Sequence, residues 1–175
     1  MSRKNSLHYL RKIALVSALA AASIVLGKLL AINIGASNRI SFENLPVLFA
    51  GLYLGPVYGM LCGTVADLVG SLMVGYAINP IITVGAASIG LVAGLVFRLA
   101  KRTPFRCALS VLSAHLIGSI VIKTAGLVIF YHLPFLATLF WRIVIYAFTG
   151  ALECLLLVLL EKNTAFQKQM AKFLS

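Results

Sequence analysis

Acidic residues are scarce in this sequence: 15 Lys and Arg accompany only 4 Asp and Glu, and 11% of the 175 residues are charged. Long polar stretches are missing too, because 61% of the residues are hydrophobic and the mean hydropathy is +1.03. A water-soluble domain of this length could not cover so much apolar surface. Strand-type alternation, which a β-barrel needs, is also absent. The composition therefore predicts an all-α integral membrane protein.

Motifs for catalysis and nucleotide binding are missing as well. Neither Gly27-Lys28 nor Lys123-Thr124 has the leading glycines of a phosphate-binding loop, and no serine lies in a Gly-x-Ser-x-Gly turn. The three cysteines are scattered without the spacing of a metal site. We predict that the chain is not an enzyme, uses no cofactor or metal, and does not hydrolyse ATP itself.

Six apolar stretches are candidates for membrane spans, each of which needs roughly 20 residues. Within a single membrane domain, 1–175, we expect spans at about 13–34, 40–54, 57–74, 80–97, 108–131 and 134–160. The second is short, because its apolar core, 45–54, covers only about 15 Å as a helix. For the first, a signal peptide ending at Ala18-Leu19-Ala20 is the alternative, but the apolar run continues well past it.

Basic residues predict the orientation, since Lys and Arg near span ends stay in the cytoplasm. They cluster at the N-terminus, in the loop 98–106 and in the tail 162–175. If all three clusters are cytoplasmic, an even number of spans separates them, so the short second segment crosses and both chain ends lie inside. The tail has Phe166, Met170 and Phe173 on one face, which predicts an amphipathic helix on the inner membrane surface; a frayed tail is the alternative. Topology explains most of the positive charge, which therefore does not indicate nucleic-acid binding.

Four cations lie outside those clusters, namely Lys28, Arg39, Lys123 and Arg142. Three of them fall inside spans, where charge is costly and usually functional. In the expected spans, Lys28, Lys123 and Arg142 lie at a similar depth, about 10 Å below the outer surface. Arg39 covers them from the first outer loop. This pattern predicts one net-positive cavity that opens outward and takes an anionic solute.

The alternative is that these charges only pair with Asp67, Glu43 and Glu153, or that the lysines extend to the membrane surface. Helical spacing predicts three polar stripes that face the bundle interior: Arg142, Tyr146, Thr149 and Glu153; His115, Ser119 and Lys123; Thr64, Asp67 and Ser71. The only tryptophan, Trp141, precedes Arg142 and either borders the cavity or serves as an interfacial anchor, the commoner role.

Small residues recur every four positions in two places, which lets helices approach closely. One set, near the expected cytoplasmic end of the first span, is Ala14, Ala18 and Ala22. It can serve a partner protein or packing within the chain. The other set is Gly51, Gly55, Gly59 and Gly63, for which we expect internal packing and a hairpin at Pro56.

These residues resemble a known family, the substrate-binding S-components of energy-coupling factor (ECF) vitamin importers. The alanine stripe resembles the family's docking motif for its transmembrane coupling subunit. The central spans are similar through Leu45-Pro46-Val47, Gly51, Gly55-Pro56, Gly59, Gly63 and Ala66-Asp67. Two segments, 39–46 and 76–80, look most like the folate-specific group, known as FolT.

The resemblance implies a six-helix bundle with cytoplasmic termini in the bacterial plasma membrane. It implies that the bundle binds folate under its outer loops and topples when docked on a coupling subunit and two ATPase subunits. Folate carries a dianionic glutamate tail for the four cations, and a flat pterin that Asp67 or Glu43, the Asn79 amide and stacking aromatics such as Trp141 would contact.

Other interpretations stay open from the sequence. The vitamin could be pantothenate, riboflavin or a pyrimidine-type compound. An ion-coupled carrier would use Asp67 or Glu153 as its ion site, but we find no internal repeat of the kind such carriers contain. A purely structural subunit would leave the outer cations unexplained.

Overall fold

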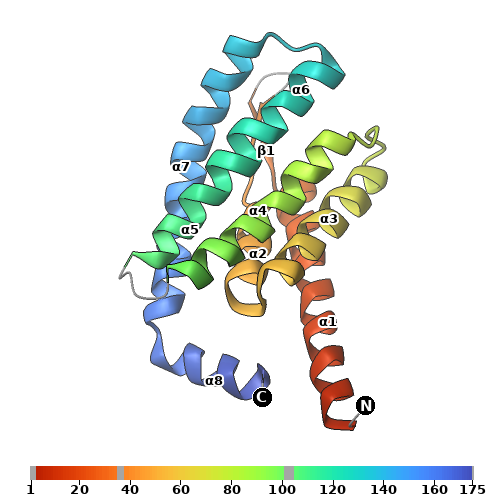
Figure 1. Cartoon of the computed structure of the whole chain (residues 1–175). Coiled ribbons are helices and arrows are strands. Elements are labelled where there is room, and N and C mark those ends of the chain that lie inside the picture. Colours follow the sequence, from red (N-terminus) through yellow and green to blue (C-terminus); the bar gives the residue numbers. More distant parts are fainter. Residues whose placement is uncertain (1–2, 35–37, 101–104, 175) are drawn as a thin grey trace.

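The computed structural model of the chain describes residues 3–34, 38–100 and 105–174, almost all of them helical (Figure 1). In chain order the elements, with η for π-helical segments, are α1 (Arg3–Ile24), η1 (Val25–Leu29), β1 (Ile32–Ile34), β2 (Asn38–Ile40), α2 (Asn44–Phe49), η2 (Ala50–Leu54), α3 (Pro56–Met73), α4 (Pro80–Leu99), α5 (Arg106–Ala114), η3 (His115–Ile122), α6 (Lys123–Tyr131), α7 (Phe135–Lys162) and α8 (Thr164–Leu174). Lys101, Arg102 and the N-terminal Ser2 lie outside the described residues, as do the side chains of Arg3 and Lys4 in the expected N-terminal cluster.

Five helices in the described residues are long and apolar enough to cross a membrane. They are Tyr9–Leu29, Pro56–Met73, Pro80–Leu99, Arg106–Tyr131 and Phe135–Lys162. The second expected segment forms a shorter apolar helix, Asn44–Leu54, made of α2 and η2. At 1.5 Å per residue it reaches about 16 Å, roughly half of a bilayer core.

Two expected span boundaries are wrong. The first helical run ends at Leu29 and not near residue 34, and the next helix begins at Asn44 and not at residue 40. Between them, β1 pairs antiparallel with β2, with Asn33 opposite Arg39. Apolar residues such as Ile32 and Ile34 extended the hydrophobic run without belonging to the helix, so hydropathy alone misplaced its end.

Glycines let α2–η2, α3 and α4 pack backbone against backbone. A Cβ added at Gly90 would overlap the backbone of Gly59, and one added at Gly63 would overlap the carbonyl of Ala86. Gly55 has φ +112°, which favours glycine, and leads directly into Pro56 at the start of α3. The expectation that these glycines serve internal packing and a hairpin is confirmed.

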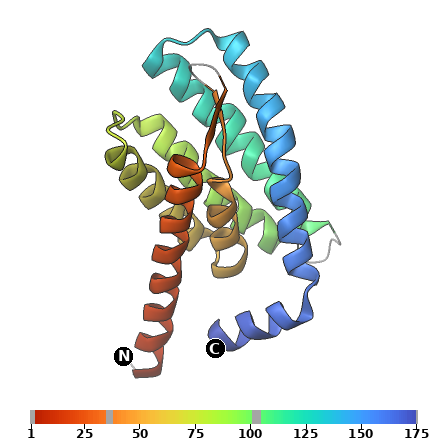
Figure 2. The same cartoon turned by 180° about the vertical axis from the view of Figure 1, so that it is seen from behind.

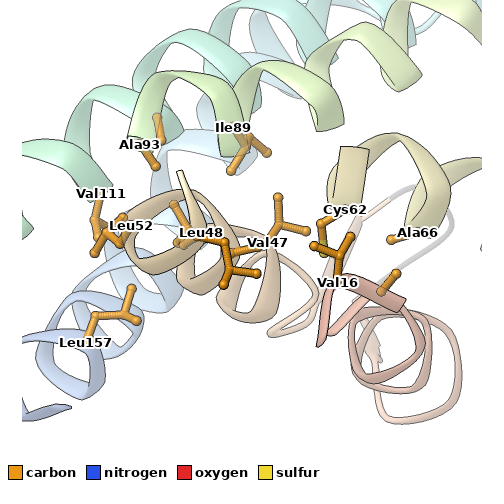
Figure 3. Close-up of a cluster of buried hydrophobic side chains, with 14 of the residues drawn as sticks. Val16, Val47, Leu48, Leu52, Cys62, Ala66, Ile89, Ala93, Val111 and Leu157 are labelled. Atoms are coloured by element: carbon orange, nitrogen blue, oxygen red, sulfur yellow. The ribbon is translucent and has the colours of Figure 1, made fainter. Parts of the chain in front are cut away.

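The apolar core lies around the short helix. Figure 3 shows Val47, Leu48 and Leu52 facing Ile89 and Ala93 of α4. Leu48 and Ile89 are fully buried, as is Leu157 of α7. The short helix is thus enclosed by longer ones, which explains how an element of about 16 Å keeps its place in the bundle.

The C-terminal helix α8 folds back beneath the bundle, and both ends of the chain lie at the same end of the molecule (Figure 2). The Phe166 ring packs on Phe49 and Tyr53, with ring centroids 5.9 and 5.4 Å apart. Met170 is half-buried, whereas Lys168 is exposed. The tail is therefore an amphipathic helix, as expected, and Phe166 contacts the chain's own short helix.

Candidate functional site: a charged cavity in the half opposite the termini

A cavity of about 690 Å³ lies in the half of the bundle opposite the chain termini. The end of α1–η1, the β-hairpin and helices α3, α4, α6 and α7 surround it. All four cations singled out in the sequence line it, together with two carboxylates: Lys28, Arg39, Lys123, Arg142, Glu43 and Asp67. The prediction that these cations share one net-positive cavity is confirmed.

Glu43 links two of the cations. Arg39 Nη2 donates to its Oε2 at 3.0 Å, and Lys123 Nζ donates to its Oε1 at 3.1 Å. Its backbone carbonyl accepts a hydrogen bond from Ser23 Oγ at 2.6 Å, which fixes the loop before α2 against α1. Glu43 therefore holds two of the cations in place and organises one side of the cavity.

Asp67 has a different partner from the one expected. Its Oδ2 accepts a hydrogen bond from Thr83 Oγ1 of α4 at 2.6 Å. No ion pair joins it to Lys28 or Lys123 among the described residues, so the interpretation of Asp67 as their structural partner is wrong. The side chain still lines the cavity, and its Oδ1 has no hydrogen-bond partner among the described residues.

Lys28 and Arg142 form no ion pair within the described part of the chain. Lys28 Nζ lies 5.5 Å from the centre of the Tyr76 ring. Arg142 donates from Nε and Nη2 to the Ser119 carbonyl, at 2.9 and 2.7 Å. The alternative in which acidic residues merely neutralise the cations therefore accounts for only part of the charge.

Asn79 has a structural role that the sequence analysis missed. Its side-chain oxygen caps α4 by accepting from Ile81 N and Ile82 N at 3.0 and 3.3 Å. Its amide nitrogen donates to the Gly126 carbonyl at 2.9 Å. The side chain lines the cavity but is largely engaged in joining α4 to α6. Asparagine directly before proline was the available signal for a helix cap.

Trp141 is not among the residues that line the cavity. It is exposed, and its ring packs edge-on against Phe140 at 6.0 Å. The aromatic rings at the cavity come instead from Tyr76, Tyr131 and Tyr146. Of these, Tyr146 had been placed on an inward stripe by its spacing from Arg142, whereas Tyr76 and Tyr131 follow helix ends and carried no periodic signal.

Glu153 lies deeper in the bundle and does not reach the four cations. Its Oε2 is 2.6 Å from His115 Nε2, and the carboxylate is fully buried. His115 Nδ1 in turn lies 3.1 Å from Ser119 Oγ. The stripes of α7 and η3 thus face the bundle interior, as their helical spacing predicted, and the structure adds that they meet each other through Glu153 and His115.

The alanine stripe lies on the opposite side of α1 from the core. Ala14, Ala18 and Ala22 are all exposed, whereas Val16 and Ala20 are buried. The alternative that this stripe packs within the chain is therefore wrong.

The fold and cavity define a membrane-embedded substrate-binding protein, and comparison with known proteins gives its family. The family model of the ECF transporter, substrate-specific component, matches residues 11–161. The chain belongs to this family. It is therefore an integral membrane, substrate-binding subunit of a vitamin transporter that works with coupling and ATPase subunits, and is not itself an enzyme.

Two solved structures share the fold. One is FolT bound with folic acid, with 22% identity and a TM-score of 0.69 over 88% of this chain and 94% of that one. The other is the S-component for biotin from an ECF-type ABC transporter, with 18% identity and a TM-score of 0.67 over 95% and 97%. No curated protein matches the sequence significantly.

Proposed function

We propose that this chain is the folate-binding S-component of an ECF importer in the bacterial plasma membrane. The observation that carries the proposal is the charge of the cavity, where four cations accompany two carboxylates. Folate brings two carboxylates on its glutamate tail, enough to balance that excess. A volume of about 690 Å³ is within the range of cavities that hold drug-sized ligands.

In this proposal the glutamate tail lies against Lys28 and Arg142, which have no carboxylate partner among the described residues. A hydrogen bond from a guanidinium to a carboxylate is charge-assisted and therefore strong. The pterin head then lies near Asp67, whose unshared oxygen can accept from the ring amine and amide, and stacks on a tyrosine such as Tyr76. Glu43 keeps Lys123 and Arg39 in place.

Transport in this proposal uses the exposed stripe Ala14, Ala18 and Ala22 as the docking surface for the coupling subunit, to which two ATPase subunits are attached. The small side chains let a partner helix approach closely within the lipid, where packing drives helix association. We further propose six crossings with both termini cytoplasmic, the short helix Asn44–Leu54 completing its crossing with the flanking loops.

Ligand binding by the purified chain tests the proposal. Titration with folate in detergent, without ATP or partner subunits, should give saturable quenching of the single Trp141 at submicromolar concentrations, because folate absorbs where tryptophan emits. Riboflavin and pantothenate should not compete. If folate changes neither the emission nor the thermal unfolding temperature, the folate assignment is wrong.

Biotin is the second candidate, because the biotin S-component shares the fold at nearly the same TM-score. Biotin has one carboxylate and is smaller than folate, so it would leave one of the two unpaired cations without an anionic partner. A competition experiment distinguishes the two vitamins. If folate displaces bound biotin at a concentration far below that of biotin, folate is the ligand; if biotin displaces bound folate in the same way, biotin is the ligand.

A further inference from the structure

A buried polar cluster below the cavity joins η3 to α7. It consists of His115 with Ser119 Oγ on one ring nitrogen, at 3.1 Å, and Glu153 on the other, at 2.6 Å. All three residues are buried, and Glu153 Oε1 has no hydrogen-bond partner in the described part of the chain. Ionisable side chains at this depth are costly to bury, and apolar residues would pack there at least as well. The cluster therefore calls for a role beyond packing.

The cluster contacts both partners of Arg142. The first partner is the carbonyl of Ser119, whose side chain bonds His115. The second is Tyr146, whose hydroxyl accepts from Arg142 Nη2 at 3.3 Å and whose ring lies 5.1 Å from the His115 ring. His115 thus contacts both residues that accept hydrogen bonds from the guanidinium, and Glu153 contacts the other ring nitrogen of His115.

This arrangement leaves part of the Arg142 guanidinium without a protein partner, and Arg142 lines the cavity. A guanidinium has five N–H donors, and the bonds to Ser119 and Tyr146 use those on Nε and Nη2. The two on Nη1 have no protein partner among the described residues. The ring of Tyr146 lies 5.1 Å from the guanidinium carbon and limits how the group can turn.

We infer that His115 and Glu153 are positioning residues that hold Ser119 and Tyr146 so that Arg142 presents its free edge to a carboxylate in the cavity. The inference rests on the proposed binding of an anionic vitamin and adds a specificity role for two residues that do not line the cavity. Without Glu153, the His115 ring is free to turn, both supports of Arg142 loosen, and anion recognition weakens while the rest of the cavity stays unchanged.

A double-mutant cycle tests the inference with folate and 6-methylpterin, which lacks both carboxylates. Glu153→Leu should weaken folate binding about tenfold, the loss expected when one charge-assisted hydrogen bond is disordered. It should leave 6-methylpterin binding unchanged. Glu153→Gln keeps an acceptor for His115 and should restore most of the affinity. In an Arg142→Gln background, Glu153→Leu should cause no further loss, because both changes act through one group.

The matched control is Glu161→Leu, which removes the other acid of α7. Glu161 pairs with Arg106 at 2.5 Å and does not line the cavity, so folate affinity should not change. If Glu153→Leu fails to unfold cooperatively, Ser119→Ala decides, because it removes only the Oγ that contacts His115. It should lower folate affinity to a smaller extent, and only when Arg142 is present.

Additive losses in the cycle, equal losses for both ligands, or unchanged folate affinity in both Glu153→Leu and Ser119→Ala would each overturn the inference. If the chain binds biotin and not folate, only the proposed folate specificity is wrong. The same double-mutant cycle, measured with biotin and its neutral amide, then tests whether His115 and Glu153 position Arg142. Binding of neither vitamin overturns both proposals.

Discussion

The two halves of this bundle are built in contrasting ways. In the half that holds the termini, glycines such as Gly59 and Gly90 bring helix backbones into direct contact. In the other half, long charged side chains such as Lys28 and Arg142 line a cavity between the helices. Packing in the half with the termini sets the angles between the helices. These angles determine where the charged side chains of the cavity half lie. Folding and ligand binding are thus carried by different residues, which substitutions can separate.

The largest effect is expected in the packed half. Gly90→Val should destabilise the bundle by about 3 kcal/mol or more, because its side chain would overlap the backbone of Gly59, which cannot move aside. Thermal unfolding in detergent measures the loss. The control Val84→Leu adds bulk at an exposed position of the same helix and should change little. A normal unfolding temperature for Gly90→Val would contradict the close helix packing.

The second prediction separates docking from binding. Ala18→Trp adds bulk to the exposed stripe of α1 and should abolish vitamin uptake while the purified chain binds its ligand normally. Uptake by cells that express the full transporter and titration of the purified chain are the two measurements. Ile13→Trp, at an exposed position of α1 outside the four-residue repeat of the stripe, is the control. Equal loss of binding in Ala18→Trp would contradict a docking role.

In the cavity half, Lys123→Gln should weaken binding of an anionic vitamin by about 1 to 3 kcal/mol. The change also leaves Glu43 with one cation fewer, which adds local repulsion toward the ligand. Calorimetric titration measures the affinity, and Lys168→Gln on α8 is the matched control with an exposed lysine. If Lys123→Gln lowers the unfolding temperature but not the affinity, Lys123 is structural.

The smallest effect is expected at Trp141. Because this residue is exposed and does not line the cavity, Trp141→Phe should change ligand affinity by less than about 0.5 kcal/mol. Calorimetry, which does not depend on tryptophan emission, gives the comparison with the unchanged chain. A clear loss of affinity would return Trp141 to the binding site and place the ligand nearer to α7.

Some predictions depended only on local patterns, and these agree with the structure. Helical periodicity predicted that the polar stripes of η3 and α7 face the bundle interior, and glycine spacing predicted close packing within the chain. The grouping of Lys28, Arg39, Lys123 and Arg142 was predicted from their expected depth alone. The position of a residue along a helix axis follows from its number, because each residue adds a fixed rise. The expected depth of each cation can therefore be calculated from the sequence.

Other predictions required knowledge of which helix faces which, and there the sequence was insufficient. The partner of Glu153 is His115, and the partner of Asp67 is Thr83. Asn79 lines the cavity, but its side-chain amide forms hydrogen bonds with α4 and α6. Trp141 does not line the cavity. Charge suggested different pairs, because it says nothing about the rotation of one helix relative to another.

By itself, the sequence determined that this chain is a helical membrane protein and predicted that four cations share one cavity, because hydropathy and helical rise are local properties. Only the tertiary structure decided that the first helix ends at Leu29 in a β-hairpin, that Glu43 holds two cations, and that Arg142 rests on Ser119. Those outcomes depend on helix rotation and side-chain geometry, and contacts between distant segments fix both.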